Sequence, residues 1–174
     1  MKEPTDEKLM AEVAGGNLDA LRVLFERHHV HVFNFLNKMC GDKMLSEDIT
    51  QEVFYKLMKY RTSYDNGKFI SWLFTIARNS LRTHFRRAKD AYVDLDVAAY
   101  KLMEKKEEKE EDYSYLQKAL NSLEASDREL LILNKFQEIK YEELALIVGS
   151  TPGAVKTKVC RALKKLKVIY FENI

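Results

Sequence analysis

The chain has 174 residues, of which 46% are hydrophobic and 32% are charged. This apolar content excludes general disorder, and the presence of only six glycines and two prolines argues against a loop-rich β protein. We therefore expect an all-α protein of one or two domains with modest cores. Because no apolar run approaches the length of a membrane span and the N-terminus lacks a signal-peptide core, we also expect a soluble, cytoplasmic protein without membrane insertion.

The charges are segregated along the chain although the net charge is only +2. Residues 78–89 hold five Lys or Arg and no acid, and residues 150–168 hold six and no acid. Residues 88–113 hold nine acids against five lysines. This distribution, rather than the net charge, is what indicates nucleic-acid binding.

The cysteines and histidines give no pattern of a metal or disulfide site. Cys40 and Cys160 lie far apart in sequence, which fits a reducing compartment. His28 and His31 have a spacing that could hold a metal, but no third ligand of matching spacing follows, and partly buried or surface histidines are the preferred interpretation. No metal and no cofactor are expected.

The sequence of the N-terminal part predicts a series of helices. A short helix over about residues 5–14 ends at a Gly-Gly pair, and Asn17 then caps a long helix that ends near residues 39–41. Ser46 is expected to cap a further helix through about Tyr60. The outer side of that helix carries an acidic and amide-bearing strip, which is either a solvated face or a docking surface for a basic partner helix. The strip consists of Asp48, Gln51, Glu52 and Tyr55.

The helix expected over residues 69–87 carries two different faces. Its apolar stripe, with Leu73, Phe74 and Ala77 at its centre, has the spacing of a core-facing helix. The opposite face bears Arg82, Arg86 and other polar side chains without an acid, which suits phosphates and unstacked bases. The alternative is a basic solvated helix with its tryptophan packed beneath a neighbouring loop.

The remainder divides into a linker and a second domain. Apolar periodicity is lost over residues 88–112, which predicts a solvated charged linker between domains at residues 1–87 and 113–174. In the second domain, residues 126–129 spell a capping box before an apolar run. Residues 141–163 then read as a helix-turn-helix, in which Gly149 allows a left-handed turn and Thr151 caps a helix that begins at Pro152.

The second helix of this motif is suited to the major groove of DNA. Val155 and Val159 lie on its buried stripe, whereas Thr157, Arg161 and Lys164 point outward. Outward side chains would meet base edges, and flanking lysines would meet phosphates. A helix-turn-helix that merely packs against a protein does not need such a basic rim.

Taken together, the motifs resemble the sigma factors of bacterial RNA polymerase, specifically the two-domain extracytoplasmic-function class. The resemblance covers about residues 9–166. Three motifs carry it, SEDITQEVF at 46–54, FISWLFTIARN at 69–79 followed by two arginines, and YEELALIVGSTPGAVKTKVCRAL at 141–163. It implies a promoter-specificity subunit, which is not an enzyme, with core RNA polymerase, promoter DNA and an anti-sigma factor as partners.

The resemblance also implies roles for particular residues. The acidic strip would dock on the clamp helices of the largest polymerase subunit, and the loop at residues 63–68 would capture a flipped base of the minus-ten element. Contacts to the minus-ten element would come from Tyr64, Asp65, Asn66, Lys68, Trp72, Arg78, Asn79, Arg82, Thr83, Arg86 and Arg87. Contacts to the minus-thirty-five element would come from Thr151, Lys156, Thr157, Lys158, Arg161 and Lys164. The linker would lead toward the RNA exit path.

The chain departs from the family pattern at several positions. Thr83 stands where the family usually has Asp, and the usual Leu-Pro at the start of the second domain is Leu123-Glu124. Ala154 and Lys158 replace the usual Thr and Arg of the recognition helix, so the promoter sequence cannot be borrowed from relatives.

Two other classes of function are alternatives to a sigma factor. A free-standing helix-turn-helix regulator with an N-terminal dimerisation domain would shift its operator unaided. An enzyme has little support, because no nucleophile, base and orienting group occur together in a motif and no phosphate-cradling glycine loop is present.

Overall fold

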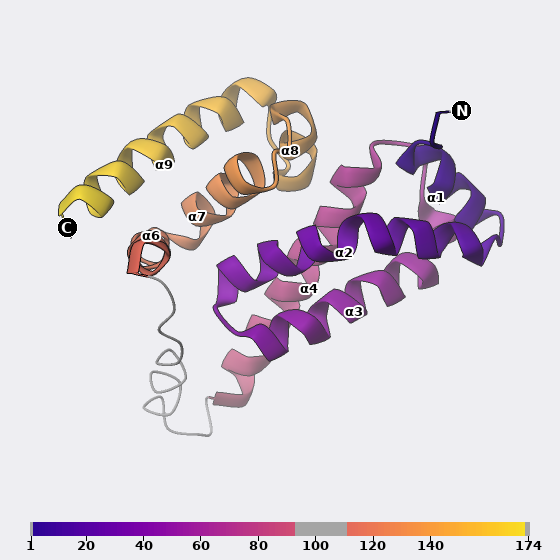
Figure 1. The fold of residues 1–174 in the computed structure, drawn as a ribbon, viewed down its shortest axis with the longest axis horizontal. Helices are drawn as coiled ribbons and strands as arrows, with labels where there is room; N and C mark the ends of the chain where they lie inside the picture. Colours follow the sequence, from indigo (N-terminus) through magenta and orange to yellow (C-terminus); the bar gives the residue numbers. More distant parts are fainter. Residues whose placement is uncertain (1, 93–110, 173–174) are drawn as a thin grey trace.

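The computed structural model describes residues 2–92 and 111–172, and all of its regular elements in these ranges are helices. Figure 1 shows two groups of helices, an N-terminal group of α1 to α4 and a C-terminal group of α6 to α9. The predicted all-α class is therefore confirmed. Within the described ranges, no helix is both long and apolar enough to cross a membrane.

The N-terminal group consists of a short helix and three long ones. Its members are α1 (Asp6–Ala14), α2 (Leu18–Cys40), α3 (Lys43–Lys59) and α4 (Phe69–Tyr92). Each long helix turns an apolar stripe inward, and Phe35 of α2 meets Phe74 of α4 edge to face with ring centroids 5.7 Å apart. The core of this group is thus built where α2, α3 and α4 meet.

The ends of α2 follow from local sequence. The Asn17 side chain accepts a hydrogen bond from Asp19 N, and Gly41 closes the helix with a left-handed φ of 68°. Glycine reaches that φ without the steric cost that a Cβ imposes. The predicted cap and end of this helix are confirmed.

The predicted start of α3 at Ser46 was wrong. The helix begins one turn earlier, and Asp42 caps it by accepting a hydrogen bond from Leu45 N at 3.0 Å. Ser46 is fully buried, and its hydroxyl donates to Asp42 O. Asp42 and Ser46 are both residue types that favour an N-cap, and they lie four residues apart. Because Ser46 is buried against the core, Asp42 is the residue that caps the helix.

The C-terminal group is built from shorter helices and one long one. Its members are α6 (Glu111–Asn121), α7 (Ala125–Leu131), a π-helical turn η2 (Ile132–Phe136), α8 (Tyr141–Val148) and α9 (Pro152–Glu172). Gly149 has φ 68° between α8 and α9, and Thr151 Oγ1 accepts from Ala154 N at 3.2 Å. The helix-turn-helix and its cap are as predicted.

The predicted capping box at residues 126–129 was wrong. The helix α7 starts at Ala125, its N-cap Glu124 makes no side-chain cap, and Glu129 is buried with 6% of its surface exposed. The Glu129 carboxylate bonds to Arg78 of α4 instead of to the start of its own helix. The local pattern predicted that Glu129 would cap its own helix. In the structure its carboxylate instead binds Arg78, which lies 51 residues away in the sequence.

The two groups pack against one another. Helix α8 lies on α4, and η2 and α7 lie against α2. The structure therefore holds the groups in direct contact, whereas the sequence predicted only a linker between them. Residues 88–92 extend α4 beyond the predicted edge at residue 87, and most of the predicted linker lies outside the described residues.

Candidate nucleic-acid interfaces

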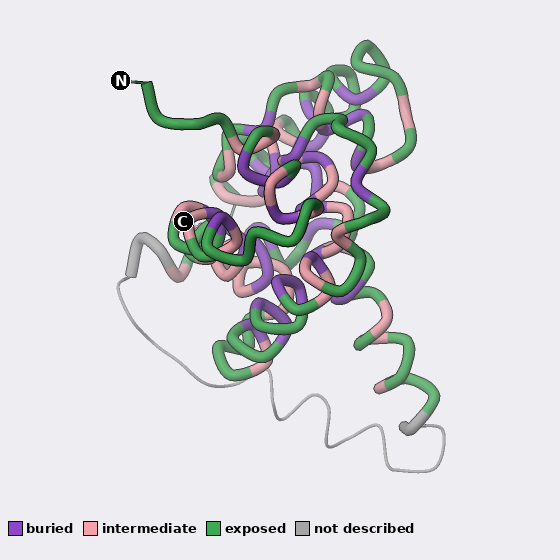
Figure 2. The backbone as a smooth tube through the Cα atoms, turned by 90° about the vertical axis from the view of Figure 1, so that its right-hand side faces the viewer, coloured by how far each residue is buried: buried purple, intermediate pink, exposed green. Residues whose placement is uncertain are grey.

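The face of α4 opposite the core is exposed and cationic toward its C-terminal end. Asn79, Arg82, Arg86 and Arg87 are exposed, while Leu73, Phe74, Ala77 and Leu81 form the buried side. Figure 2 shows the last turns of α4, next to the grey trace, extending beyond the rest of the molecule with mostly exposed residues. These guanidinium groups can reach phosphates without rearrangement of the core.

Two residues of this face are only partly available. Trp72 is half-buried, and its ring lies 5.2 Å from the ring of Tyr64. Thr83 is half-buried near the C-terminal end of the face. The packing of Trp72 against Tyr64 agrees with the alternative interpretation of this tryptophan, in which it packs beneath a loop.

Tyr64 supports the loop that precedes α4. It is 7% exposed, and its hydroxyl donates a hydrogen bond to Gly67 O at 2.5 Å. Burial, followed by the negative charges of Glu7, Asp65 and Asp6, raises the pKa of Tyr64 to about 12. In this conformation its ring is not offered to a base, and its first role is to hold the loop.

The tip of the same loop is open to solvent. Asp65, Asn66 and Lys68 are exposed, and Asp65 Oδ1 accepts from Gly67 N at 3.1 Å in an Asx turn. Asn66 has a positive φ of 61°, which an asparagine tolerates better than most residues. These three side chains therefore lie together at the exposed tip of the loop.

Sequence reasoning missed the residue that caps α4. The Phe69 N–H donates to the Glu7 carboxylate of α1 at 3.2 Å, so α1 closes the N-terminus of α4 across 62 residues of sequence. A carboxylate suits this position because the helix dipole favours negative charge there. No local motif could have revealed it.

Arg78 lies in the contact between the two groups rather than on the free face. Its Nε donates to Glu129 Oε1 at 2.6 Å, and its Nη1 donates to Ile147 O at 3.3 Å. The side chains of Arg78 and Glu129 are 16% and 8% exposed. The prediction placed Arg78 at the margin of the DNA face, and the structure pairs its Nε and Nη1 with protein acceptors.

The outward face of α9 matches the pattern expected for a recognition helix. Thr151, Lys156, Thr157, Lys158, Arg161 and Lys164 are all exposed. The opposite side of the helix is buried through Val155, Val159 and Ala162. The six predicted residues therefore share one accessible surface at the N-terminal part of α9.

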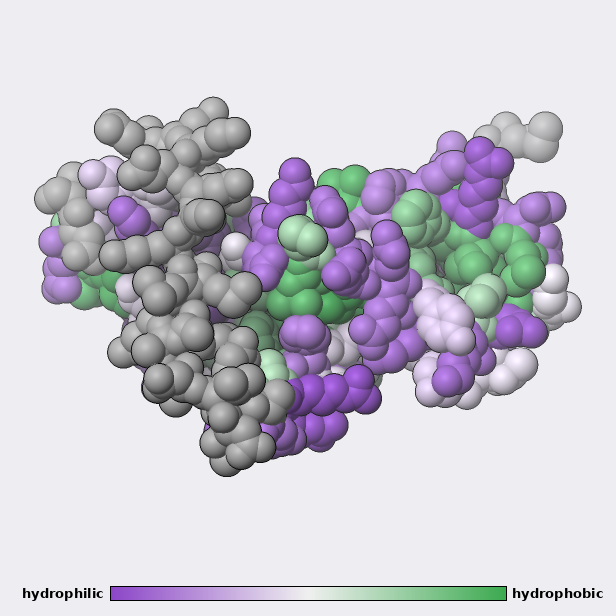
Figure 3. Space-filling view, turned by 90° about the horizontal axis from the view of Figure 1, so that it is seen from below, coloured by the Kyte–Doolittle hydropathy of each residue, from purple (hydrophilic) through white to green (hydrophobic). Residues whose placement is uncertain are grey.

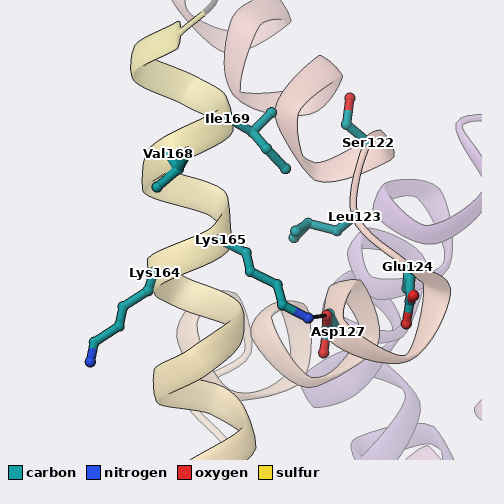
Figure 4. Close-up of a pocket in the computed structure, with 8 residues that line it drawn as sticks. All are labelled: Ser122, Leu123, Glu124, Asp127, Lys164, Lys165, Val168 and Ile169. Atoms are coloured by element: carbon teal, nitrogen blue, oxygen red, sulfur yellow. Dashed lines mark hydrogen bonds and ion pairs between the residues drawn. The ribbon is translucent and has the colours of Figure 1, made fainter.

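A shallow, mostly apolar groove of about 470 Å³ lies behind this face, between α9 and the junction of α6 and α7. Figure 4 shows Lys165 reaching across it to Asp127, whereas Lys164 points away into solvent. The Lys165 Nζ–Asp127 Oδ2 distance is 3.0 Å, and the hydrogen bond to Asp127 raises the pKa of Lys165. The two neighbouring lysines thus differ in their surroundings, since Lys165 pairs with Asp127 and Lys164 points into solvent.

The acidic strip on α3 is exposed as predicted from its helical spacing. Asp48 and Gln51 are exposed, Tyr55 is 57% exposed, and Glu52 pairs with Lys56 at 2.7 Å. Lys56 also donates to Ser80 of α4, which ties this ion pair to the bundle. Figure 3 shows that the hydrophilic surface on this side is interrupted by apolar areas at the end where α1 lies.

The histidine cluster considered for a metal has a structural role. His28 is buried, and its Nε2 lies 2.8 Å from Asp6 Oδ2. Within residues 2–92 and 111–172, no group of three or more metal-ligating side chains comes together. His31 lies 3.3 Å from Gln137 of the C-terminal group.

Comparison with protein families matches both groups of helices. The family model described as sigma-70 region 2 covers residues 24–91, and the model described as sigma-70, region 4 covers residues 113–166. The chain belongs to the sigma-70 family, in its extracytoplasmic-function class. It is therefore a promoter-specificity subunit of RNA polymerase.

Two curated relatives have nearly the same extent as this sigma factor. It is 31% identical to RNA polymerase sigma factor CarQ of Myxococcus xanthus, over 94% of this chain and 96% of CarQ. It is 28% identical to ECF RNA polymerase sigma factor SigM of Bacillus subtilis, over 87% of this chain and 95% of SigM. Both alignments extend across region 2 and region 4.

Solved structures share the fold of this sigma factor. It is similar to CnrH in complex with the cytosolic domain of CnrY, with a TM-score of 0.76, 24% identity, and coverage of 97% of this chain and 99% of CnrH. It is also similar to the sigma factor RpoE of Bartonella quintana, solved with the anti-sigma factor NepR. That match has a TM-score of 0.71 and 25% identity, over 85% of this chain and 94% of RpoE.

Proposed function

We propose that this sigma factor divides promoter recognition between its two basic helical faces. The exposed end of α4, with the loop at residues 64–68, would engage the minus-ten element and assist strand opening. The outward face of α9 would read the minus-thirty-five element as duplex. The observation that carries this proposal is that residues 79–87 of α4 and residues 151–164 at the start of α9 present exposed cations without an acid among them, each in a different sigma-70 region. Asp65 in the loop and Asp90 in the last turns of α4 lie outside these stretches.

The division of the chain follows the same proposal. Residues 1–87 would form the region 2 domain, residues 88–112 the linker, and residues 113–174 the region 4 domain, with α4 extending a few residues into the linker segment. The protein would act in the cytoplasm, where its polymerase works, and would have no chemistry of its own. The similar sigma factor RpoE is bound to the anti-sigma factor NepR, and we propose an anti-sigma partner for this chain too.

The acidic strip would dock on a basic helical surface of core polymerase. Asp48, Gln51 and Tyr55 are exposed side by side on one helix, and an aromatic ring among polar groups is typical of an interface anchor. Glu52 adds a carboxylate that its pairing with Lys56 holds in one position. Opposite charge on the partner would orient the encounter and fix its register.

The test is assembly with core polymerase followed by run-off transcription. Glu52→Lys should weaken assembly by about tenfold because it places a positive charge against a basic partner. Glu26→Lys is the control, since Glu26 is an exposed acid on a different helix, α2. Equal assembly of both variants would show that the strip is only a solvated surface.

The wild-type protein also tests the alternative of a free-standing regulator. As a sigma factor it should initiate transcription when mixed with core enzyme and should bind duplex promoter DNA poorly alone. Tight binding to a palindromic site without polymerase would favour the regulator.

A further inference from the structure

Helix α1 joins the side of α2 to the start of α4 through two adjacent carboxylates. Asp6 binds α2, where its Oδ2 lies 2.8 Å from His28 Nε2 and its Oδ1 accepts from Arg27 Nη1 at 3.0 Å. Glu7 binds α4, where its Oε1 accepts from the Phe69 N–H at 3.2 Å. The His28 ring also lies 5.3 Å from the Phe69 ring. The three helices therefore meet at the N-terminus of α4.

Apolar packing holds α1 in place. Leu9, Met10 and Val13 are at most 4% exposed, and α1 packs along α2. A helix of nine residues is not stable alone in water, so this tertiary contact keeps α1 folded. The helix also contacts the start of α4 and η1 (Arg61–Ser63), a 3-10 turn that leads into the loop at residues 64–68. A carboxylate on α1 is therefore presented from a fixed support.

The start of α4 has no capping acceptor in the residue that precedes it. A helix leaves its first four N–H groups without a partner inside the helix. Lys68 stands just before Phe69, and a lysine side chain has donors but no acceptor. Asp65 is the nearest preceding acid, and its Oδ1 accepts from Gly67 N within the loop. Glu7 therefore supplies from another helix the acceptor that the local sequence does not place at this end.

Glu7 is also close to the other end of the loop. Tyr64 begins the loop, is 7% exposed, and places its ring 5.2 Å from the ring of Trp72 near the start of α4. Burial, and after it the negative charge of Glu7, raises the pKa of Tyr64 to about 12. One carboxylate thus lies near Tyr64 at the beginning of the loop and binds Phe69 just after its end.

A base taken out of the duplex is read well only by a site that already has its shape. The position of the exposed tip, with Asp65, Asn66 and Lys68, depends on how the two ends of the loop are held. A loosely held loop has to be ordered when a base binds, and it can also adapt to the wrong base. Glu7 is half-buried behind the loop, so its part in recognition is to hold the loop. This step rests on the proposed assignment of the loop to the minus-ten element.

We propose that Glu7 is a positioning residue for minus-ten recognition, whose carboxylate caps α4 from α1 and so fixes the loop that takes the displaced base. Helix α1 then contributes to promoter specificity without touching DNA. Loss of Glu7 loosens the loop and lowers discrimination at the minus-ten element. Discrimination at the minus-thirty-five element is unaffected, because α9 belongs to region 4.

Run-off transcription with core polymerase measures discrimination at each element separately. The templates differ by one base at a minus-ten or a minus-thirty-five position, and the ratio of products from the best and worst base gives the selectivity at that position. Glu7→Ala should lower the selectivity at a minus-ten position by about fivefold, as expected for loss of a helix cap, and leave the minus-thirty-five selectivity unchanged.

Glu12→Ala is the matched control on the same helix. Glu12 is also a half-buried acid of α1, but its carboxylate accepts from Asn17 Nδ2 at 3.2 Å, at the end of α1 away from the loop. This variant should keep the selectivity of the wild type at both elements. Wild-type minus-ten selectivity in Glu7→Ala would overturn the proposal, and so would an equal loss of selectivity at both elements.

The one tryptophan of the chain gives a second measurement, made on the free full-length protein without DNA. Trp72 is half-buried and packs against Tyr64, so its fluorescence reports how firmly the loop is held. Glu7→Ala should raise the constant for quenching by acrylamide about twofold, because local opening exposes the ring, and Glu12→Ala should leave it unchanged. Equal quenching in the two variants would contradict a role of Glu7 in holding the loop.

Glu7→Gln keeps the test valid if melting curves show that Glu7→Ala does not fold. Glutamine retains an oxygen that can accept from the Phe69 N–H, and it removes the negative charge that the helix dipole favours. The minus-ten selectivity should then fall by about twofold, with no change at the minus-thirty-five element. In that case, wild-type selectivity of the folded Glu7→Gln protein would overturn the proposal.

The wild-type protein separates failure of this proposal from failure of the proposed function. Absence of selectivity at every minus-ten position in the wild type would refute the proposed role of the loop itself. A selective wild type with an equally selective Glu7→Ala variant would refute only the positioning role of Glu7.

Discussion

Side chains of one type differ in role because their partners come from distant parts of the chain. Arg78 and Arg82 are one turn apart on α4, yet Arg78 is held by Glu129 while Arg82 is exposed. Lys164 and Lys165 are adjacent on α9, yet Lys165 pairs with Asp127. At the scale of residues, exposure and pairing therefore decide which cations remain available to DNA.

Asp6 shows the same dependence in the anchoring of α1. Its carboxylate lies 2.8 Å from His28 Nε2 and accepts from Arg27 Nη1 at 3.0 Å. The hydrogen bond to His28 is the largest of the effects that lower the pKa of Asp6, against the opposing effect of burial. This residue joins α1 to α2.

Replacing Asp6 with Asn should lower the free energy of unfolding by about 1 to 2 kcal/mol at pH 7. Because the pKa of Asp6 is lowered in the folded state, its contribution is complete above the ordinary value of 3.8 and is lost as the pH falls through the folded value. Urea titrations over a pH series would measure this, with the exposed Asp90→Asn as control. A difference between the wild type and Asp6→Asn that stays constant down to pH 2 would contradict the assignment.

At the scale of elements, short sequence signals set most helix boundaries. The Asn17 and Thr151 caps and the Gly41 and Gly149 ends were predicted from adjacent residues. The start of α3 and the capping box at residues 126–129 were wrong, because Ser46 and Glu129 are buried against other helices. A cap signal is therefore reliable only where its side chain stays at the helix end.

The turn of the helix-turn-helix offers a prediction at this scale. Gly149→Ala should destabilise the protein by about 1 to 2 kcal/mol, because φ of 68° is costly for a residue with a Cβ. Gly153→Ala is the matched control, since Gly153 is helical with open space around its Cβ position and should gain up to about 1 kcal/mol. Thermal melting would reveal the opposite signs, and equal effects would show that the turn does not require a glycine.

At the scale of the whole molecule, the protein makes two kinds of electrostatic contact. The contact of Arg78 with Glu129 is largely shielded from water, whereas the cations of α9 are exposed. Salt screens exposed charges much more than buried ones. The packing of region 4 on region 2 and promoter binding should therefore respond differently to ionic strength.

Raising salt from about 0.1 to 0.5 M should change the distance between the regions of the free protein very little. Over the same range of salt, the promoter affinity of the polymerase complex should fall steeply. Lys156→Ala should reduce the slope of the logarithm of the promoter binding constant against the logarithm of the salt concentration by about 1. Lys8→Ala, at an exposed lysine of α1, is the control. Separation of the two groups of helices with salt would show that the contact of Arg78 with Glu129 behaves as an ordinary surface ion pair.

The sequence by itself determined the helical class, the apolar and basic faces of α4 and α9, and the turn at Gly149. These depend on residues within a few positions of one another, so helical spacing and backbone preferences suffice to find them. The exposure of the acidic strip on α3 followed from the same spacing.

Only the tertiary structure decided which polar groups meet. Glu7 caps α4 across 62 residues, Arg78 reaches Glu129 across 51, and Ser71 reaches Glu143 across 72. No periodicity encodes such pairs, because each depends on how two separately folded stretches come to lie against each other. The chain thus specifies its proposed DNA-binding surfaces locally, and the packing of region 4 on region 2 determines which of their side chains are exposed.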